Sequence, residues 1–109
     1  MEKTEQRKIL QDWGEKFKSF KAKDATPKMY SRFYEDLERA GLIDTSYTEH
    51  MKGRTLDDVI PKVKELSFSD CKTYLTFILR AERWAEGWFA ERTENGDIYK
   101  LLSRASEVI

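Results

Sequence analysis

His50 and Cys71 are the side chains of this sequence whose types most directly suggest covalent chemistry, and each is the only residue of its kind. An imidazole beside a thiol can form a nucleophilic pair. Cys71, however, falls at an apolar position of an expected helix, where a free cysteine behaves as a small hydrophobic side chain. A single histidine also excludes the usual helical zinc motifs, which need two. We therefore predict no catalytic residue, no cofactor-binding residue and no metal ligand.

The most unusual charge in the sequence belongs to Glu82, within residues 80–88. On a helix Glu82 falls four residues after Ile78, so its carboxylate points along an apolar face. Such a carboxylate is costly to bury unless it is paired or hydrogen-bonded. Arg80 and Arg83 flank it but point elsewhere, so we expect its partner to come from another helix or another chain. A salt bridge that fixes helix packing is the favoured interpretation, and a ligand or partner contact and an acid–base role stay open.

Trp84 and Trp88 stand four residues apart, so on a continuous helix their rings would be neighbours. Their side is offset from the apolar stripe through Leu75 and Ile78, which places both rings at the edge of the expected core. Tryptophan is enriched among interface hot spots. We therefore expect a two-fold dimer in which Trp84 or Trp88 meets its own copy. The candidate partner or ligand contacts are Arg80, Glu82, Arg83, Trp84 and Trp88.

Apolar residues recur at spacings of three and four along nearly the whole chain, which predicts an all-α fold that positions these residues. The longest helix should begin at Phe68, reach at least Ala85 and continue to Asn95, unless Gly87 ends it. We expect a compact single domain, residues 1–109, of five or six helices. The other expected helices cover residues 5–21, 27–40, 56–66 and 98–105, the last of them capped by Asp97. A short helix through Tyr47 and Met51 should start from a cap at Asp44 or Thr45 and end at Gly53.

Local signals bound several of these helices. Thr55 and Ser67 each stand three residues before an aspartate, which resembles a capping box, although the usual acidic partner is Glu or Gln. Pro61 must kink or restart its helix because it lacks an N–H group. Asn95 and Gly96 form the strongest hairpin signal, but the flanking residues do not alternate. We therefore interpret that pair as the end of one helix and the start of the next.

Composition limits the class of protein. The 109 residues fit one domain, and twenty basic and twenty acidic side chains give a formal net charge of zero. Dedicated nucleic-acid binders usually carry a clear basic excess. A lone cysteine forms no intrachain disulfide, and no apolar run is long enough to span a bilayer. We expect a cytoplasmic protein that does not enter membranes.

Residues 75–87, Leu-Thr-Phe-Ile-Leu-Arg-Ala-Glu-Arg-Trp-Ala-Glu-Gly, with the later glycine and apolar C-terminal helix, carry a resemblance. This C-terminal third is similar to a family of small prokaryotic proteins known as a domain of unknown function, DUF6508. The resemblance brings no assigned activity. The matching positions are Leu75, Thr76, Arg80, Glu82, Arg83, Trp84, Gly87 and Gly96.

Two classes of function follow, with a small-molecule enzyme a distant third. The favoured class is a non-enzymatic helical interaction module that binds a protein partner or its own copy, because aromatic residues are abundant and catalytic motifs are absent. The alternative is a nucleic-acid-associated regulatory protein that uses the lysine-rich segment from Lys16 to Lys28. Residues 1–28 hold eight basic and five acidic side chains, a surplus of only three.

Overall fold

A computed structural model describes residues 1–109, and the all-α fold class is confirmed: there are seven α-helices, two short 3₁₀ helices and no strand. The number of helices exceeds the five or six predicted, because α6 is separate from α5 and η2 is separate from α4. The elements are α1 (Lys3–Phe17), η1 (Ala22–Asp24), α2 (Pro27–Arg39), α3 (Tyr47–Met51), α4 (Leu56–Val59), η2 (Ile60–Glu65), α5 (Phe68–Ala81), α6 (Trp88–Glu94) and α7 (Asp97–Val108).

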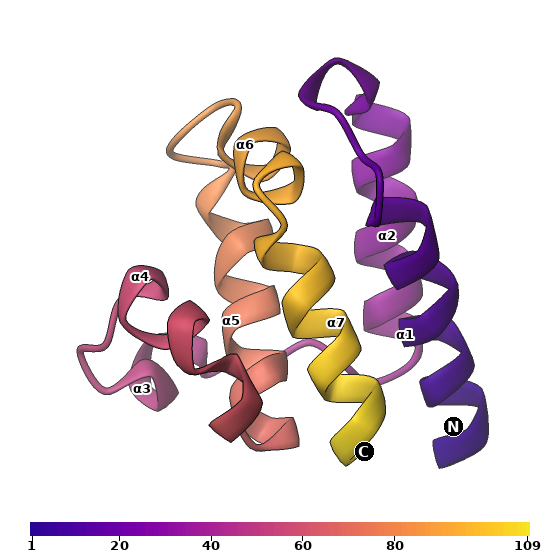
Figure 1. Ribbon diagram of the computed structural model, residues 1–109, viewed down its shortest axis with the longest axis vertical. Helices are drawn as coiled ribbons and strands as arrows, with labels where there is room; N and C mark the ends of the chain where they lie inside the picture. Colours follow the sequence, from indigo (N-terminus) through magenta and orange to yellow (C-terminus); the bar gives the residue numbers. More distant parts are fainter.

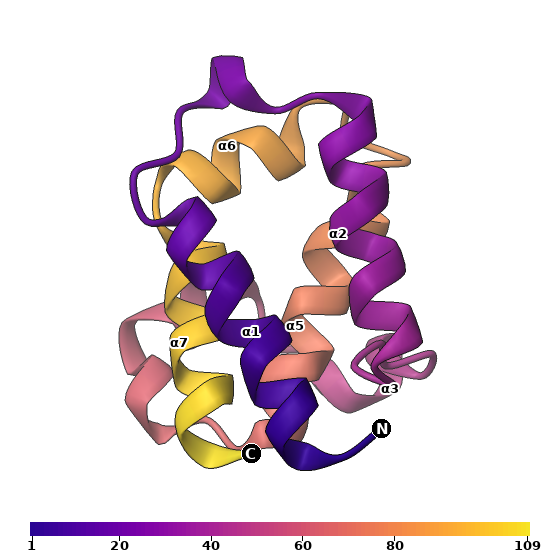
Figure 2. The ribbon, with the colours of Figure 1, turned by 90° about the vertical axis from the view of Figure 1, so that its right-hand side faces the viewer.

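Helix α7 packs against both α1 and α5, and Figure 1 shows it between them. The short elements α3, α4 and η2 gather at one side of this group, with α3 against α5 and η2 against α7. At the opposite end α6 lies across the molecule and contacts η1, as Figure 2 shows. None of these helices is long and apolar enough to cross a bilayer.

The core is rich in aromatic rings, as expected from fourteen aromatic residues in 109. The rings of Trp13 and Phe33 are 4.9 Å apart, and those of Phe17 and Phe33 are 5.0 Å apart. Phe89 joins them at 6.1 Å from Phe17, so this one cluster ties α1, α2 and α6 together. Such large rings supply much buried apolar area in a domain of this size.

The two predicted capping boxes are confirmed, whereas α3 starts after Ser46 and α7 after Gly96 without a side-chain cap, so the caps expected from Asp44 or Thr45 and from Asp97 are wrong. The Thr55 side chain accepts a bond from the backbone of Asp58, whose carboxylate accepts one from Thr55 N–H, and Ser67 pairs with Asp70 in the same way. A capping box thus forms with aspartate in the place of glutamate. At Pro61 the helix restarts rather than merely bends, because α4 ends at Val59 and the 3₁₀ helix η2 begins at Ile60.

Helix α5 is shorter than predicted. It ends at Ala81, and residues 82–87, here called the α5–α6 loop, separate it from α6. Gly87 adopts φ 89°, a left-handed conformation that other residues rarely adopt, and it stands immediately before the first residue of α6. At the next junction Gly96, with φ 92°, separates α6 from α7, which confirms the helix-end interpretation and excludes a hairpin there.

Candidate functional site

The α5–α6 loop contains three of the five residues predicted as contacts, and Glu82 is the first of them. Its carboxylate accepts bonds from the backbone N–H groups of Gly87, at 3.2 Å, and Phe89, at 2.9 Å. The favoured expectation of a salt bridge is therefore wrong, although one of the two N–H partners, Phe89, does belong to another helix. Because α5 ends before Glu82, the carboxylate turns toward the start of α6, where unpaired N–H groups favour a negative charge. Glu82 holds the loop closed.

Trp84 lies in this loop with 86% of its surface exposed, and the only other exposed large apolar residue is Met1, at 55%. The surrounding backbone is well bonded: Arg83 N–H donates to Arg80, and Trp84 and Ala85 N–H both donate to Ala81. The loop projects beyond the end of α5 (Figures 1 and 2). A hydrogen-bonded turn thus presents the indole ring to solvent.

Trp88 has a different environment, because it begins α6 rather than continuing α5. It is half-buried, its ring is 5.9 Å from that of Phe77, and the Arg92 guanidinium lies 4.3 Å over it. The prediction that Trp84 and Trp88 are neighbours on one helix is therefore wrong. Trp88 packs within the fold, and Trp84 does not.

Arg80 is in the last turn of α5, half-buried, with its guanidinium 5.8 Å over the ring of Tyr34 from α2. It forms no ion pair, and its shielded Nε has no hydrogen-bond acceptor. Arg83 in the loop is exposed and also forms no ion pair. Two cations therefore stand at this end of α5 without a carboxylate partner.

Helix α2 contributes Tyr30 and Tyr34 to the same region. The Tyr30 hydroxyl donates to the backbone oxygen of Leu79 near the end of α5. Burial, followed by the nearby Tyr34 and Glu82, raises the pKa of Tyr30. A hollow of about 290 Å³ lies between Arg83 and these two tyrosines. We call Tyr30, Tyr34, Arg80 and Arg83 together the Arg80 surface.

The sequence alone does not identify Tyr30 and Tyr34 as site residues, because their spacing fits the apolar face of α2 and indicates core positions. The available signal was the hydroxyl group, since a buried tyrosine usually needs a hydrogen-bond partner at its polar end. Tyr30 finds that partner on Leu79. Tyr34 stays half-buried beside Arg80. Both residues are partly core and partly surface.

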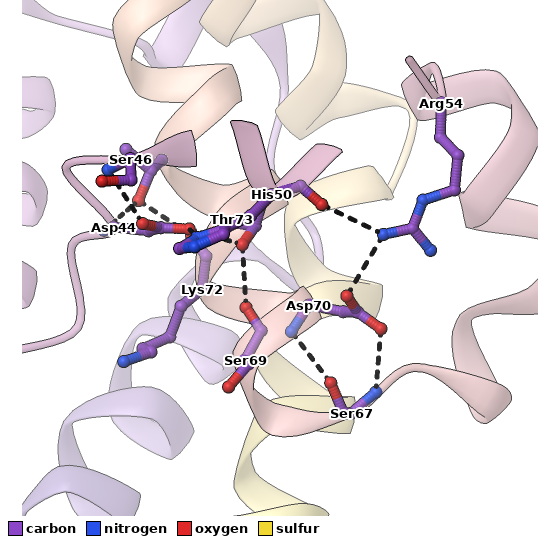
Figure 3. Close-up of polar contacts among 10 residues, drawn as sticks. Asp44, Ser46, His50, Arg54, Ser67, Ser69, Asp70, Lys72 and Thr73 are labelled. Carbon is purple, nitrogen blue, oxygen red and sulfur yellow. Dashed lines mark hydrogen bonds and ion pairs between the residues drawn. The ribbon is translucent and has the colours of Figure 1, made fainter. Parts of the chain in front are cut away.

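The second region with possible chemistry lies at the other end of α5, where His50 meets Asp44 (Figure 3). His50 Nδ1 is 2.7 Å from Asp44 Oδ2, and Thr73 donates to the same oxygen at 2.6 Å. Burial alone would raise the pKa of Asp44. The hydrogen bonds from Thr73 and His50 lower that pKa by more than burial raises it, so it lies below its usual value. This network attaches the segment before α3 to α5.

Cys71 cannot serve as the nucleophile considered with His50. It is fully buried, at 0% exposure, and burial raises its pKa to about 12. A thiol with that pKa carries almost no thiolate near neutral pH, and the thiolate is the reactive form. No group of three or more His, Cys, Asp or Glu side chains is placed to hold a metal ion.

The lysine-rich segment shows a mixed surface. Lys16, Lys18, Lys21 and Lys23 are exposed, and the Lys16 ammonium lies 4.4 Å over the ring of Trp13. The adjacent hollow, about 610 Å³, is lined by the carboxylates of Asp12, Glu15 and Asp36 besides Lys16. These acids oppose the attraction of a polyanion to the lysines.

The fold is all-α, and the loop that follows the C-terminal end of α5 exposes an aromatic ring, that of Trp84. A family model described as "Family of unknown function (DUF6508)" matches residues 17–109, so the chain belongs to this family. The match begins at Phe17, the last residue of α1, so the resemblance extends well beyond the C-terminal third from which it was predicted. No curated protein matches the chain. No solved structure matches it either.

Proposed function

We propose that this protein is a non-enzymatic interaction module that binds a protein partner through the α5–α6 loop, with Trp84 as the anchor. The observation that carries this proposal is the contrast among the three tryptophans. Trp13 is 5% exposed and Trp88 is half-buried, whereas Trp84 is 86% exposed. An indole ring in water loses the favourable free energy of burial, which binding of a partner would recover.

The residues around the loop support this proposal. Arginine, tyrosine and tryptophan are the residue types most enriched at interface hot spots. The Arg80 surface supplies two tyrosines and two arginines within reach of one another, and Trp84 directly follows Arg83 in the chain. The turn bonds from Trp84 and Ala85 to Ala81 keep the backbone of the loop ordered before binding. A preorganised loop loses less conformational entropy when it binds.

The first partner to test is a second copy of the chain, in a two-fold dimer. Zero formal net charge means that two copies do not repel one another strongly at long range. Because Trp88 packs against Phe77 and Arg92, the structure favours Trp84 over Trp88 as the residue at the dimer axis.

Analytical ultracentrifugation of the wild type, Trp84→Ala and Lys64→Ala tests the proposal. Lys64 is exposed on η2 and serves as the control. We expect the wild type and Lys64→Ala to sediment at about twice the monomer mass at micromolar concentration, and Trp84→Ala as a monomer. A monomeric wild type would overturn the homodimer. If wild type and Trp84→Ala also retained the same proteins from a cell extract, the interaction module itself would be overturned.

The nucleic-acid alternative depends on the exposed lysines of the segment from Lys16 to Lys28. Its characteristic result would be DNA or RNA binding that weakens steeply as salt rises and that is lost in Lys18→Ala/Lys21→Ala. The carboxylates of Asp12, Glu15 and Asp36 beside Lys16 give this alternative less support.

A further inference from the structure

Arg80 differs from every other half-buried arginine of the protein, because it alone has no acceptor. Arg54 donates to the backbone of Met51 and to Asp70. Arg92 bonds Asp57 and Asp97, and Arg104 bonds Leu66 and Glu107. No hydrogen bond or ion pair involves the Arg80 guanidinium, and its Nε is shielded from water.

The physical consequence concerns hydration. An exposed arginine such as Arg32 can bond to water on all sides, but a half-buried one loses part of its hydration. The Tyr34 ring, 5.8 Å from the Arg80 guanidinium, offsets only part of that loss. The Nη atoms of Arg80 are not among the shielded unpaired atoms, so they can still receive an anion from outside.

The acids nearby decide which anion fits. Glu82 is already bonded to Gly87 and Phe89 N–H, so it is not available to Arg80. Glu35 lines the hollow with Arg83, Tyr30 and Tyr34. These two carboxylates balance the charges of Arg80 and Arg83, so a phosphate, with a charge of about −1.5 to −2, gains little attraction here over a singly charged carboxylate.

We propose that Arg80 is a carboxylate-binding residue that receives a Glu or Asp side chain from an acidic segment of the protein partner. The incoming carboxylate meets the two Nη atoms end-on, in the planar geometry that guanidinium groups favour. Tyr34 supplies an aromatic wall beside the ion pair, and Arg83 adds a second positive charge. This inference rests on the proposed function, because it names the chemistry of the partner of the same module.

Nuclear magnetic resonance of the full chain, with labelled arginine side chains, tests this inference. The probes are a short blocked peptide of glutamates around one leucine, its glutamine counterpart, and the same peptide with phosphoserines. We expect the Arg80 Nε–H signal to shift and saturate with the glutamate peptide and to stay in place with the glutamine peptide. Arg80→Lys should weaken binding roughly tenfold, because the planar fork is lost. Arg32→Lys, an exposed change on α2, should leave binding unchanged.

Equal shifts at Arg80 and Arg32, or no shift at Arg80, would overturn the inference, and the wild-type titration gives this result even if a variant fails to fold. Tighter binding of the phosphoserine peptide by tenfold or more would overturn the choice of a carboxylate. The two proposals fail separately. If the Arg80 signal does not shift with the glutamate peptide but association still depends on Trp84, only the carboxylate-site inference is overturned. A shift at Arg80, with association and protein retention independent of Trp84, removes only the interaction module.

Discussion

The two ends of α5 handle their polar groups in opposite ways. At the N-terminal end Ser67 and Asp70 cap the helix, Arg54 pairs with Asp70, and Asp44 accepts from Thr73 (Figure 3). At the C-terminal end Arg80 has no acceptor and Trp84 is in water. Buried and half-buried polar groups in proteins are usually bonded, so an unbonded one calls for an explanation. The N-terminal end, where the charged groups are satisfied, stabilises the fold, although the buried Tyr74 hydroxyl near Arg54 has no partner. The C-terminal end, where an arginine is unsatisfied, is where we place binding.

The largest effect on stability is expected at the satisfied end, from Asp44→Ala. The Asp44 side chain is 11% exposed and accepts bonds from Thr73, His50 and the Ser46 N–H. Loss of hydrogen bonds to a charged group should lower the free energy of unfolding by about 2–3 kcal/mol in urea denaturation. Asp12→Ala, which breaks an exposed pair with Lys8, is the control and should cost less than about 1 kcal/mol. Equal losses in the two variants would contradict the comparison.

A smaller effect of the same carboxylate should appear in the pH dependence of stability. The pKa of Asp44 is lower in the folded chain than its usual value of 3.8, so the unfolded chain binds a proton more readily. The contribution of Asp44 is therefore present above about pH 4 and is lost as the pH falls through the folded pKa. Urea titrations between about pH 5 and 2 should show a steeper loss for the wild type than for Asp44→Asn. Parallel curves would show that another group dominates.

Glu82→Ala should have a moderate effect, because Glu82 serves the loop rather than a buried ion pair. Loss of its bonds to the Gly87 and Phe89 N–H groups should cost about 1 kcal/mol, typical of a lost helix cap. Glu82→Gln should cost less, since an amide oxygen can still accept one bond. Thermal or urea unfolding measures both. A loss of about 3–5 kcal/mol would instead indicate a stranded partner charge.

The smallest effect is expected from Arg80→Met. A residue with no internal acceptor loses no bond when replaced, and Met keeps the length and apolar stem that packs near Tyr34. The free energy of unfolding should stay within about 0.5 kcal/mol of the wild type or rise. The glutamate peptide should nevertheless lose its affinity. A marked destabilisation would show that Arg80 supports the fold and would remove the contrast between the two ends of α5.

The fold class and most helix starts could be predicted because they depend on local signals. Thr55 and Ser67 carry the side chains that cap α4 and α5, and apolar spacing alone indicates the buried faces. The C-terminal end of α5 could not be placed, because periodicity continues through residues 82–89 although the backbone turns away. In the structure the Glu82 carboxylate accepts from the Gly87 and Phe89 N–H groups instead of lying along the apolar face of a continued helix, and periodicity gives no sign of these bonds.

The five candidate contacts were predicted as one patch, and the structure separates them. Trp88 belongs to the packing of α6, and Glu82 to the closure of the loop. Arg80, Arg83 and Trp84 stay without internal partners. Tyr30 and Tyr34 join Arg80 and Arg83 from a helix about fifty residues away in the chain, and no local pattern links such distant positions.

The buried thiol of Cys71 makes the opening of the folded chain measurable by its rate of alkylation. The thiol has no exposed surface in the folded chain and burial raises its pKa to about 12, so an alkylating reagent meets it only in molecules that have opened around α5. Since it is the single cysteine of the chain, the labelling rate records one event at one place. Under fast reclosing that rate is proportional to the population of opened molecules. The alkylation rate of Cys71 in the wild-type protein therefore measures the opening equilibrium around α5 without denaturant or an introduced probe.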